Sequence, residues 1–349
     1  MVARSNKESV AGDELNSSTV LARSTVRQLI ELGIQDVVLS PGSRNAPLSI
    51  AFYEAEKMGL IKLHVRIDER GAAFFALGIA KATSRYVPVV CTSGTAVANL
   101  YPAVLEAHHS DVKLLLLTAD RPSRLRKTGS NQTTNQKQIF GDFVRTQIDS
   151  ANPFDLSHVL NGRGPIHINL QFDEPLLPDA TQHGEDWLKS IHSVASPQKS
   201  HPRVSIRTST TRNLVIVGHD RAGIDAEEIV RFAKDFGAPI IAEDPLVFPH
   251  AIAHAPIILS DERTRAALLP EKVVVIGRTT LSRSINSLIA TSPYTIMIDP
   301  RIEKIDTERK ADEIHYQLPN VESKIDRDEL WFDKWAKYES MAKHRPPCL

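Results

Sequence analysis

Residues 63–80 read LHVRIDERGAAFFALGIA. The first five residues have the composition of a β-strand, and three charged residues (68–70) follow them. The remaining small and apolar residues are typical of a helix packed against the protein. Junctions of this kind at the carboxyl ends of parallel strands are where α/β proteins place their sites. The stretch therefore predicts that Glu69 is drawn towards the interior at the edge of a parallel sheet.

Two interpretations of Glu69 are open on this local pattern. A carboxylate in an apolar setting has a raised proton affinity, which suits proton-transfer chemistry. Alternatively, Glu69 is an acid in the first turn of a helix, stabilised by the helix dipole and by Arg66 or Arg70. The local pattern by itself favours this second, structural interpretation, so the choice depends on the rest of the chain.

The composition is that of a globular protein without a bias towards polyanionic partners. Among 349 residues, Lys plus Arg and Asp plus Glu number 42 each, so the charge predicts neither nucleic acid nor an anionic membrane as partner. The two cysteines, Cys91 in a predicted strand and Cys348 near the C-terminus, predict no disulfide and a reducing, cytoplasmic setting. No apolar run approaches the roughly 20 residues of a membrane span.

Helix and strand patterns alternate from residue 19 onward, which predicts an α/β fold of two doubly wound parallel-sheet domains. A stretch rich in Ser, Thr, Pro, Lys and Arg separates them and predicts an interdomain linker. The expected strands are 36–39, 63–67, 87–91, 113–117 and 164–170 in the first domain, and 214–217, 239–242, 272–276 and 294–298 in the second. The expected boundaries are a disordered lead-in (1–18), a first domain (19–192), the linker (193–212), a second domain (213–321) and a charged tail (322–349).

Three more polar loops follow predicted strands of the first domain, at 40–45, 92–95 and 118–121. Because the carboxyl ends of parallel strands meet at one edge, these loops are expected to cluster with residues 68–70. Arg44 and Arg121 could each bind a carboxylate through two parallel hydrogen bonds. Each loop alone reads as an ordinary turn or surface loop, whereas four of them at one edge favour a site.

Other segments give weaker signals. Residues 128–136 form a dense amide and hydroxyl stretch without an acid, which is either a plain polar loop or one that wraps a polar substrate. Residues 217–223 lack the spacing of the dinucleotide fingerprint. Residues 277–283 follow an apolar strand, and their two arginines either reach an anionic cleft or lie at the surface. The cysteines and 13 histidines show no metal-ligand spacing.

Six motifs carry a resemblance to a known family. They are SPGSR at 40–44, DERG at 68–71 with FALG at 75–78, TSGTAVANL at 92–100, TADRP at 118–122, GSNQ at 129–132 and GPIHIN at 164–169. In this order they resemble the thiamine-diphosphate-dependent decarboxylase superfamily, in its branch for menaquinone biosynthesis. The resemblance is specific over residues 19–180 and weaker but collinear to about residue 320.

The resemblance implies that residues 19–192 form a pyrimidine-binding domain, in which Glu69 hydrogen-bonds the aminopyrimidine ring of thiamine diphosphate and activates the cofactor. It implies a transferase that decarboxylates 2-oxoglutarate and adds the succinyl carbanion to isochorismate. It also implies at least a homodimer. The residues carried over to the isochorismate side are Ser43, Arg44, Arg121, Asn131, Gln132 and, from a looser alignment, Arg283. Those carried over to the cofactor are Glu69, Thr92, Ser93 and Gly94.

The resemblance also implies a third domain that holds the diphosphate through Mg²⁺ with a Gly-Asp-Gly motif and an asparagine pair. Gly141-Asp142-Phe143, with Asn169 downstream, lacks the second glycine and the second asparagine. We therefore expect a chain truncated before that domain, without metal ligands, that binds the cofactor poorly and is inactive in isolation. The alternatives are another thiamine-diphosphate-dependent decarboxylase or synthase, or a non-catalytic remnant that binds an anionic ligand or a subunit.

Overall fold

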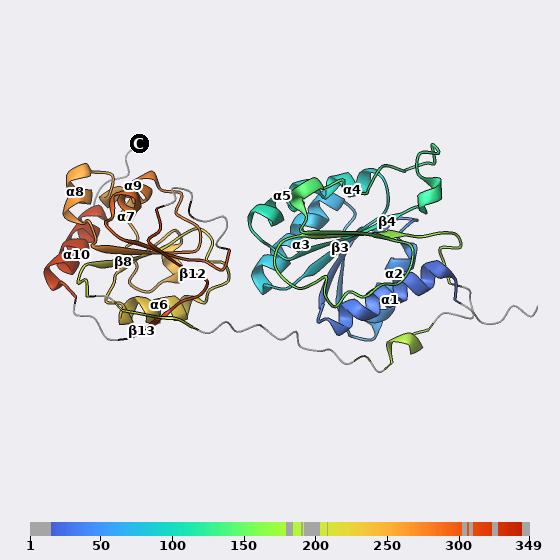
Figure 1. The fold of residues 1–349 in the computed structure, drawn as a ribbon, viewed down its shortest axis with the longest axis horizontal. Helices are drawn as coiled ribbons and strands as arrows, with labels where there is room; N and C mark the ends of the chain where they lie inside the picture. Colours follow the sequence, from blue (N-terminus) through green and yellow to red (C-terminus); the bar gives the residue numbers. More distant parts are fainter. Residues whose placement is uncertain are drawn as a thin grey trace, which may run out of the picture. The chain divides into compact units, whose positions relative to one another are not determined.

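The protein divides into two compact units, Met1–Gln198 and Lys199–Leu349, and each is an α/β unit around a parallel sheet (Figure 1). The predicted fold class is confirmed. In this computed structural model the described residues are 15–178, 184–189, 191, 203–207, 209–301, 306, 310–322 and 327–343. Cys348 and most of the predicted lead-in lie outside them. Within them, no helix has the length and apolarity needed to cross a membrane.

The first unit is built on a six-stranded sheet in the order β2-β1-β3-β4-β6-β5. Every neighbouring pair is parallel, so all the strands end at the same edge. The chain moves from β1 outward to β2 and then returns to the other side of β1, which places the topological switch point between β1 and β3. The strands are β1 (Asp36–Leu39), β2 (Lys62–Val65), β3 (Val87–Cys91), β4 (Leu114–Asp120), β5 (Thr146–Ser150) and β6 (Ile166–Gln171).

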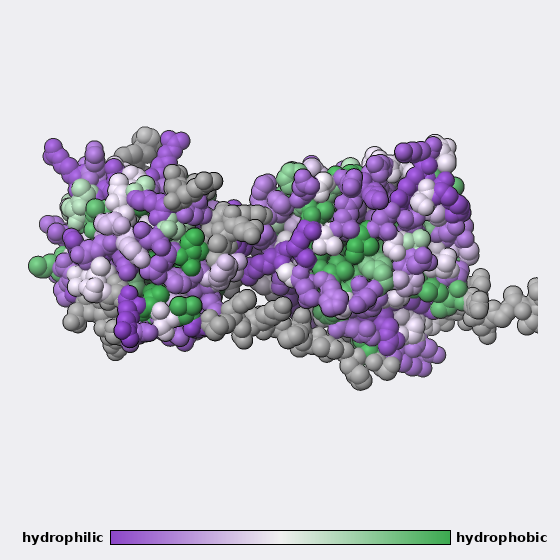
Figure 2. All heavy atoms as spheres, viewed as in Figure 1, coloured by the Kyte–Doolittle hydropathy of each residue, from purple (hydrophilic) through white to green (hydrophobic). Residues whose placement is uncertain are grey.

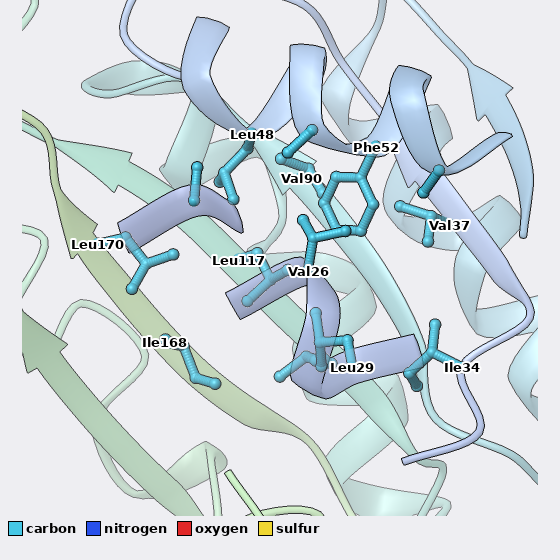
Figure 3. Close-up of a cluster of buried hydrophobic side chains, with 14 of the residues drawn as sticks. Val26, Leu29, Ile34, Val37, Leu48, Phe52, Val90, Leu117, Ile168 and Leu170 are labelled. Carbon is cyan, nitrogen blue, oxygen red and sulfur yellow. The ribbon is translucent and has the colours of Figure 1, made fainter. Parts of the chain in front are cut away.

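Helices cover both faces of this sheet (Figure 1). One face carries α1 (Ser17–Glu31) and α2 (Ala46–Lys57); the other carries α3 (Glu69–Thr83), α4 (Thr95–Asn99) and α5 (Tyr101–His109). Successive strand residues point to opposite faces, so Val37 packs beneath α1 and α2, whereas Val38 packs beneath α3. Figure 3 shows the first of these cores, with Phe52 of α2 over Val37 and Val90. Short 3₁₀ helices are η1 (Ser123–Leu125), η2 (Gly141–Phe143) and η4 (Asp186–Leu188).

The second unit has a five-stranded parallel sheet in the order β12-β11-β10-β8-β9. Its strands are β8 (Asn213–Val217), β9 (Ile240–Ala242), β10 (Lys272–Ile276), β11 (Thr295–Ile298) and β12 (Glu313–His315), and β7 (Ser205–Ile206) pairs separately with β13 (Asn320–Val321). Its helices are α6 (Ala226–Asp235), α7 (Ala255–Ile258), α8 (Glu262–Ala267), α9 (Arg283–Thr291) and α10 (Glu329–Lys343), with η5 at Pro245–Val247. The core beneath α6 and the core beneath α7, α9 and α10 lie on opposite faces of the sheet.

The predicted tail is the largest error of the sequence analysis. Residues 329–343 form α10, and both Trp331 and Trp335 are buried in the core of the second unit. The charged residues of this segment obscured an apolar stripe at 331, 335, 338 and 342, which has helical spacing. The segment is therefore part of the second unit.

Four smaller differences have local causes. β5 was not predicted because its polar residues are half-buried at a sheet edge and form no apolar run. The sequence after residue 95 also predicts one helix to about residue 107, but this segment divides into α4 and α5, since Pro102 has no N–H to continue the hydrogen-bond ladder. β7 lies within the predicted linker, and α1 begins at Ser17, inside the predicted lead-in.

We predict that Trp335→Ala lowers the free energy of unfolding of the second unit by about 3–5 kcal/mol, because it opens a cavity in a closed core. Leu330→Ala on the same helix is the control, since Leu330 is 77% exposed. Urea denaturation followed by circular dichroism measures both. Equal, small effects of the two substitutions would show that α10 is not a core element.

Candidate active site

Four polar segments follow β1, β2, β3 and β4 at the carboxyl edge of the sheet, where the sequence predicts a cluster. The Ser40 N–H donates to the Val90 carbonyl at 2.8 Å, which joins the ends of β1 and β3. Gly42 packs on Thr92 so closely that a Cβ there would lie 2.5 Å from the Thr92 Cβ. Only glycine permits this approach of the 40–45 loop to the 92–95 loop.

Arg121 is fixed at this edge by two oxygens. Its Nη1 donates to Ser93 Oγ at 3.1 Å and to the Gln132 carbonyl at 3.0 Å. Ser93 Oγ also donates to the same Gln132 carbonyl, at 3.0 Å. The 118–121 and 92–95 loops therefore hold the 128–136 loop through one backbone carbonyl.

Arg44 provides a second positive charge beside Arg121. Its Nη1 donates to the Phe172 carbonyl at 3.0 Å and lies 3.3 Å from Glu174 Oε1. Burial, and then the charge of Arg44, lower the pKa of Arg121. Two guanidinium groups held together against their mutual repulsion are characteristic of an anion-binding site.

Glu69 lies at the first turn of α3 and is half-buried, not drawn into the interior. The small residues of α3, such as Ala73 and Ala76, pack on the sheet, and the large Phe74 and Phe75 face outward. Figure 2 shows apolar side chains of this kind among polar ones on the visible surface. The expected burial of Glu69 is wrong because α3 packs on the sheet through its small residues, so its apolar composition does not draw the whole first turn into the interior.

The contacts of Glu69 bear on its two interpretations. Asn99 Nδ2 donates to Glu69 Oε2 at 3.1 Å. Arg66 instead stacks on the Phe75 ring at 4.4 Å and donates to the Val65 carbonyl. Among the described residues, neither Arg66 nor Arg70 forms an ion pair with Glu69, so the structural interpretation loses its expected partners.

The remaining predicted residues divide into exposed groups and buried ones. Ser43, Asn131 and Gln132 are exposed, whereas Thr92 and Ser93 are buried beneath them. Gln132 has a left-handed backbone with φ of 51°, a conformation that costs a non-glycine residue about 1–3 kcal/mol. The anchored carbonyl of Gln132 holds this conformation, and the Gln132 side chain packs towards Gly94, where a Cβ would lie 2.9 Å from the Gln132 Cγ.

Beneath the loops lies a buried hydrogen-bond network that the sequence does not predict. Gln136 Oε1 accepts from the Gly94 N–H at 3.0 Å, and its Nε2 donates to the Ala119 carbonyl at 3.0 Å and to Asn169 Oδ1 at 2.8 Å. Asn169 Nδ2 in turn donates to Asp120 Oδ2 at 3.0 Å and to Asp149 Oδ1 at 2.9 Å. No periodicity marks these residues, because their partners are distant in sequence.

Arg126 supplies the counter-charge of this network. It binds both oxygens of Asp149 at 2.7 Å and lies 2.9 Å from Asp120 Oδ2. Burial tends to raise the pKa of Asp149, but hydrogen bonds from Arg126, Asn169 and Gln171 outweigh it, so the pKa lies below its usual value. The carboxylate therefore stays ionised.

His167 ends the network on the other side. Burial lowers the pKa of His167 to about 3, so the ring is neutral. Thr118 Oγ1 donates to Asn169 Oδ1 at 2.8 Å, which leaves this hydroxyl as an acceptor for His167 Nε2 at 2.7 Å. His167 therefore carries its proton on Nε2 and acts as a neutral structural donor.

Arg283 belongs to the second unit, where it is the first residue of α9 and is exposed. It does not lie on the loop that the sequence predicts, because Ser282 caps the helix through the Ile285 N–H. Asp142 is exposed in η2, whereas Asn169 is buried and bonded to Gln136, Asp120 and Asp149. Among the described residues, the partial diphosphate motif therefore has no structural counterpart. No group of three or more His, Cys, Asp or Glu side chains in the described ranges could hold a metal ion.

We predict that Arg126→Met lowers the stability of the first unit by about 3 kcal/mol at pH 7, because it leaves the buried Asp120 and the half-buried Asp149 without a counter-charge. Since the folded pKa of Asp149 is depressed, its contribution is complete above the unfolded pKa of about 3.9 and is lost as the pH falls through the folded pKa. The difference from the unsubstituted protein should therefore be largest at neutral pH and shrink in acid.

Urea denaturation at pH 7 and pH 3.5 measures this difference. The control is Arg124→Met, which removes an exposed ion pair to Asp173 of 2.8 Å and should change stability little. If the stability difference between Arg126→Met and the unsubstituted protein is the same at both pH values, Arg126 does not hold the pKa of Asp149 below its usual value.

Comparison with known proteins gives consistent matches. Residues 19–139 match the family model "Thiamine pyrophosphate enzyme, N-terminal TPP binding domain". The chain is 42% identical to the "2-succinyl-5-enolpyruvyl-6-hydroxy-3-cyclohexene-1-carboxylate synthase" of a Nocardioides species, over 95% of this chain and 61% of the relative. Proteins of the same name from Paenarthrobacter aurescens and Saccharopolyspora erythraea are each 37% identical, over 93% and 81% of this chain and 60% and 55% of their own lengths. The chain thus spans about 55–61% of the length of these curated relatives.

Proposed function

We propose, from the match of residues 19–139 to the N-terminal domain of thiamine pyrophosphate enzymes, that this chain provides the isochorismate side and the cofactor-activating acid of a 2-succinyl-5-enolpyruvyl-6-hydroxy-3-cyclohexene-1-carboxylate synthase. This transferase of menaquinone biosynthesis would decarboxylate 2-oxoglutarate and join the remaining four-carbon unit to isochorismate. The observation that carries the proposal is the pair Arg44 and Arg121, held side by side at the edge where Glu69 also lies.

The residues around Glu69 fit the aminopyrimidine half of thiamine diphosphate. Asn99 binds Oε2, and within the described residues Oε1 has no hydrogen-bond partner, so one carboxylate oxygen is available to a ring nitrogen. Glu69 would share a proton with that nitrogen from Oε1. Thiamine diphosphate, when bound, supplies the electron sink for decarboxylation. Mg²⁺, which would accompany the diphosphate, is part of the proposal only through the resemblance.

The substrate side is built for anions with hydroxyl groups. Isochorismate carries two carboxylates, and a guanidinium can bind a carboxylate through two parallel hydrogen bonds. Arg121 and Arg44 would therefore hold the carboxylates, and the exposed Ser43, Asn131 and Gln132 would bind the polar groups between them. Arg121 is already held in place before the anion arrives, and a substrate carboxylate would replace Glu174 at Arg44.

Two other functions remain possible outcomes of the test. Another thiamine-diphosphate-dependent decarboxylase would consume 2-oxoglutarate or a different oxo acid without isochorismate. A non-catalytic protein would bind an anionic ligand or subunit through the arginines and would not need Glu69. A cytoplasmic setting, a homodimer or higher oligomer, and a contribution of Arg283 from the second unit are proposed from the resemblance alone.

The decisive assay measures CO₂ release from 2-oxoglutarate, with thiamine diphosphate and Mg²⁺, in the presence and absence of isochorismate. It is run on this chain alone and on this chain joined to the remaining part of the Nocardioides relative. Isochorismate-dependent release supports the proposal, and release that ignores isochorismate identifies another decarboxylase.

In the form that is active, Glu69→Gln should reduce turnover by about 10²–10⁴-fold, because it removes the proton acceptor at the cofactor ring. Asp68→Asn is the matched control: it removes the adjacent charge and keeps an N-cap acceptor for the Gly71 N–H. If both variants retain turnover, Glu69 has no role in proton transfer.

Glu174→Gln should tighten the binding of isochorismate by about two- to fivefold, because it removes an exposed carboxylate that competes for Arg44. The control is Glu185→Gln, whose carboxylate pairs with Lys57 away from the site. Calorimetric titration of this chain with isochorismate measures both. Weaker binding after Glu174→Gln would mean that Glu174 supports the site and does not compete with the substrate.

A further inference from the structure

Gln136 connects parts of the site that come from three different strands. Its side chain is fully buried, and its three hydrogen bonds reach Gly94 after β3, Ala119 in β4 and Asn169 in β6. The amide orientation is unambiguous: a backbone N–H can only donate to an oxygen, and a carbonyl can only accept from the NH₂ group. Every polar atom of the side chain is therefore paired.

The hydrogen bond to Gln136 fixes the position of the Gly94 backbone N–H. Gly94 has φ of 84° and ψ of −135°, a conformation open to glycine, and its N–H points into the protein at the start of α4. A Cβ at this position would lie 3.0 Å from the Gln132 carbonyl oxygen. The Gln136 amide thus fixes the backbone against which Gln132 packs.

The same amide also anchors the C-terminal end of the 128–136 loop. The loop is anchored at Gln132 by Ser93 and Arg121, and at Gln136 by its own buried side chain. Between and before these anchors lie exposed amides and hydroxyls without regular structure. Two anchors four residues apart restrict a segment that would otherwise lose substantial conformational entropy on binding a ligand.

We infer that Gln136 is a positioning residue of the site: it touches no substrate, and it holds the 92–95 and 128–136 loops in the geometry that presents Asn131 and Gln132. The inference about affinity rests on the proposed function, while the inference about loop geometry does not. Neither the family match nor the names of the relatives assign a role to this residue.

The test is hydrogen exchange and isochorismate titration on the full chain, comparing Gln136→Met with the unsubstituted protein. Met keeps the volume and removes all three hydrogen bonds. Exchange should rise at least about tenfold in peptides covering 92–99 and 128–138, because the buried Gly94 N–H loses its acceptor. Exchange in β4 should stay unchanged, and the Kd for isochorismate should rise about tenfold or more.

Lys137→Met is the matched control, since the neighbouring side chain is exposed; it should leave exchange in both segments unchanged. Gln136→Glu is the second variant, which keeps an acceptor for the Gly94 N–H and loses the two donors. It should protect 92–99 better than Gln136→Met does, a rescue that a general loss of stability would not give. If Gln136→Met does not fold, Gln136→Glu is compared with the unsubstituted protein: exchange that rises in 128–138 but stays near the unsubstituted level in 92–99 supports the inference, and a uniform rise overturns it.

A uniform rise of exchange across the first unit, or no change in either segment, would overturn the inference. The inference would also be overturned if exchange rose only in 92–99 and 128–138 while the Kd of Gln136→Met for isochorismate stayed equal to that of the unsubstituted protein. If the unsubstituted chain binds no isochorismate, the proposed function fails for this chain, and the exchange pattern alone decides whether Gln136 positions the loops.

Discussion

Buried hydrogen-bond donors and acceptors must find partners inside the protein, and at the edge of the first sheet this requirement determines the geometry of the loops. Asn169 and Gln136 are fully buried amides whose partners lie on β4, on β5 and after β3. Losing one of them would leave several buried groups unpaired at once. The network therefore acts as a unit beneath the loops. Because the loops are bonded to it, it also restricts the movement of the exposed residues above it.

The charges follow the same arrangement. The carboxylates of Asp120 and Asp149 are paired with Arg126 below the loops, and Asp120 also accepts from the Arg121 backbone N–H at 2.8 Å. Arg121 is held by a hydroxyl and a carbonyl, and Arg44 by a carbonyl and by the exposed carboxylate of Glu174. Two cations at the edge, one of them paired with a carboxylate that a ligand can displace, suit the binding of dicarboxylates.

The sequence predicted the fold because continuous apolar strands between helices have few other solutions, and it predicted the cluster of polar loops because those loops follow the strands. It failed where the information is not local. β5 is half-buried and polar, α10 carries its apolar stripe among many charges, and α3 exposes Phe74 and Phe75. Gln136 lies in a stretch that was noticed for its amides, yet its role depends on partners 17 to 42 residues away.

The central claim is that the arginine pair at the carboxyl edge of the first unit receives the carboxylates of the substrate. A crystal structure of this chain with isochorismate tests it most directly. We expect difference density against Arg44 and Arg121, with the polar groups of the ligand near Asn131 and Gln132 and the network around Asn169 unchanged. Density at another position, or none beside these arginines at saturating isochorismate, would contradict it.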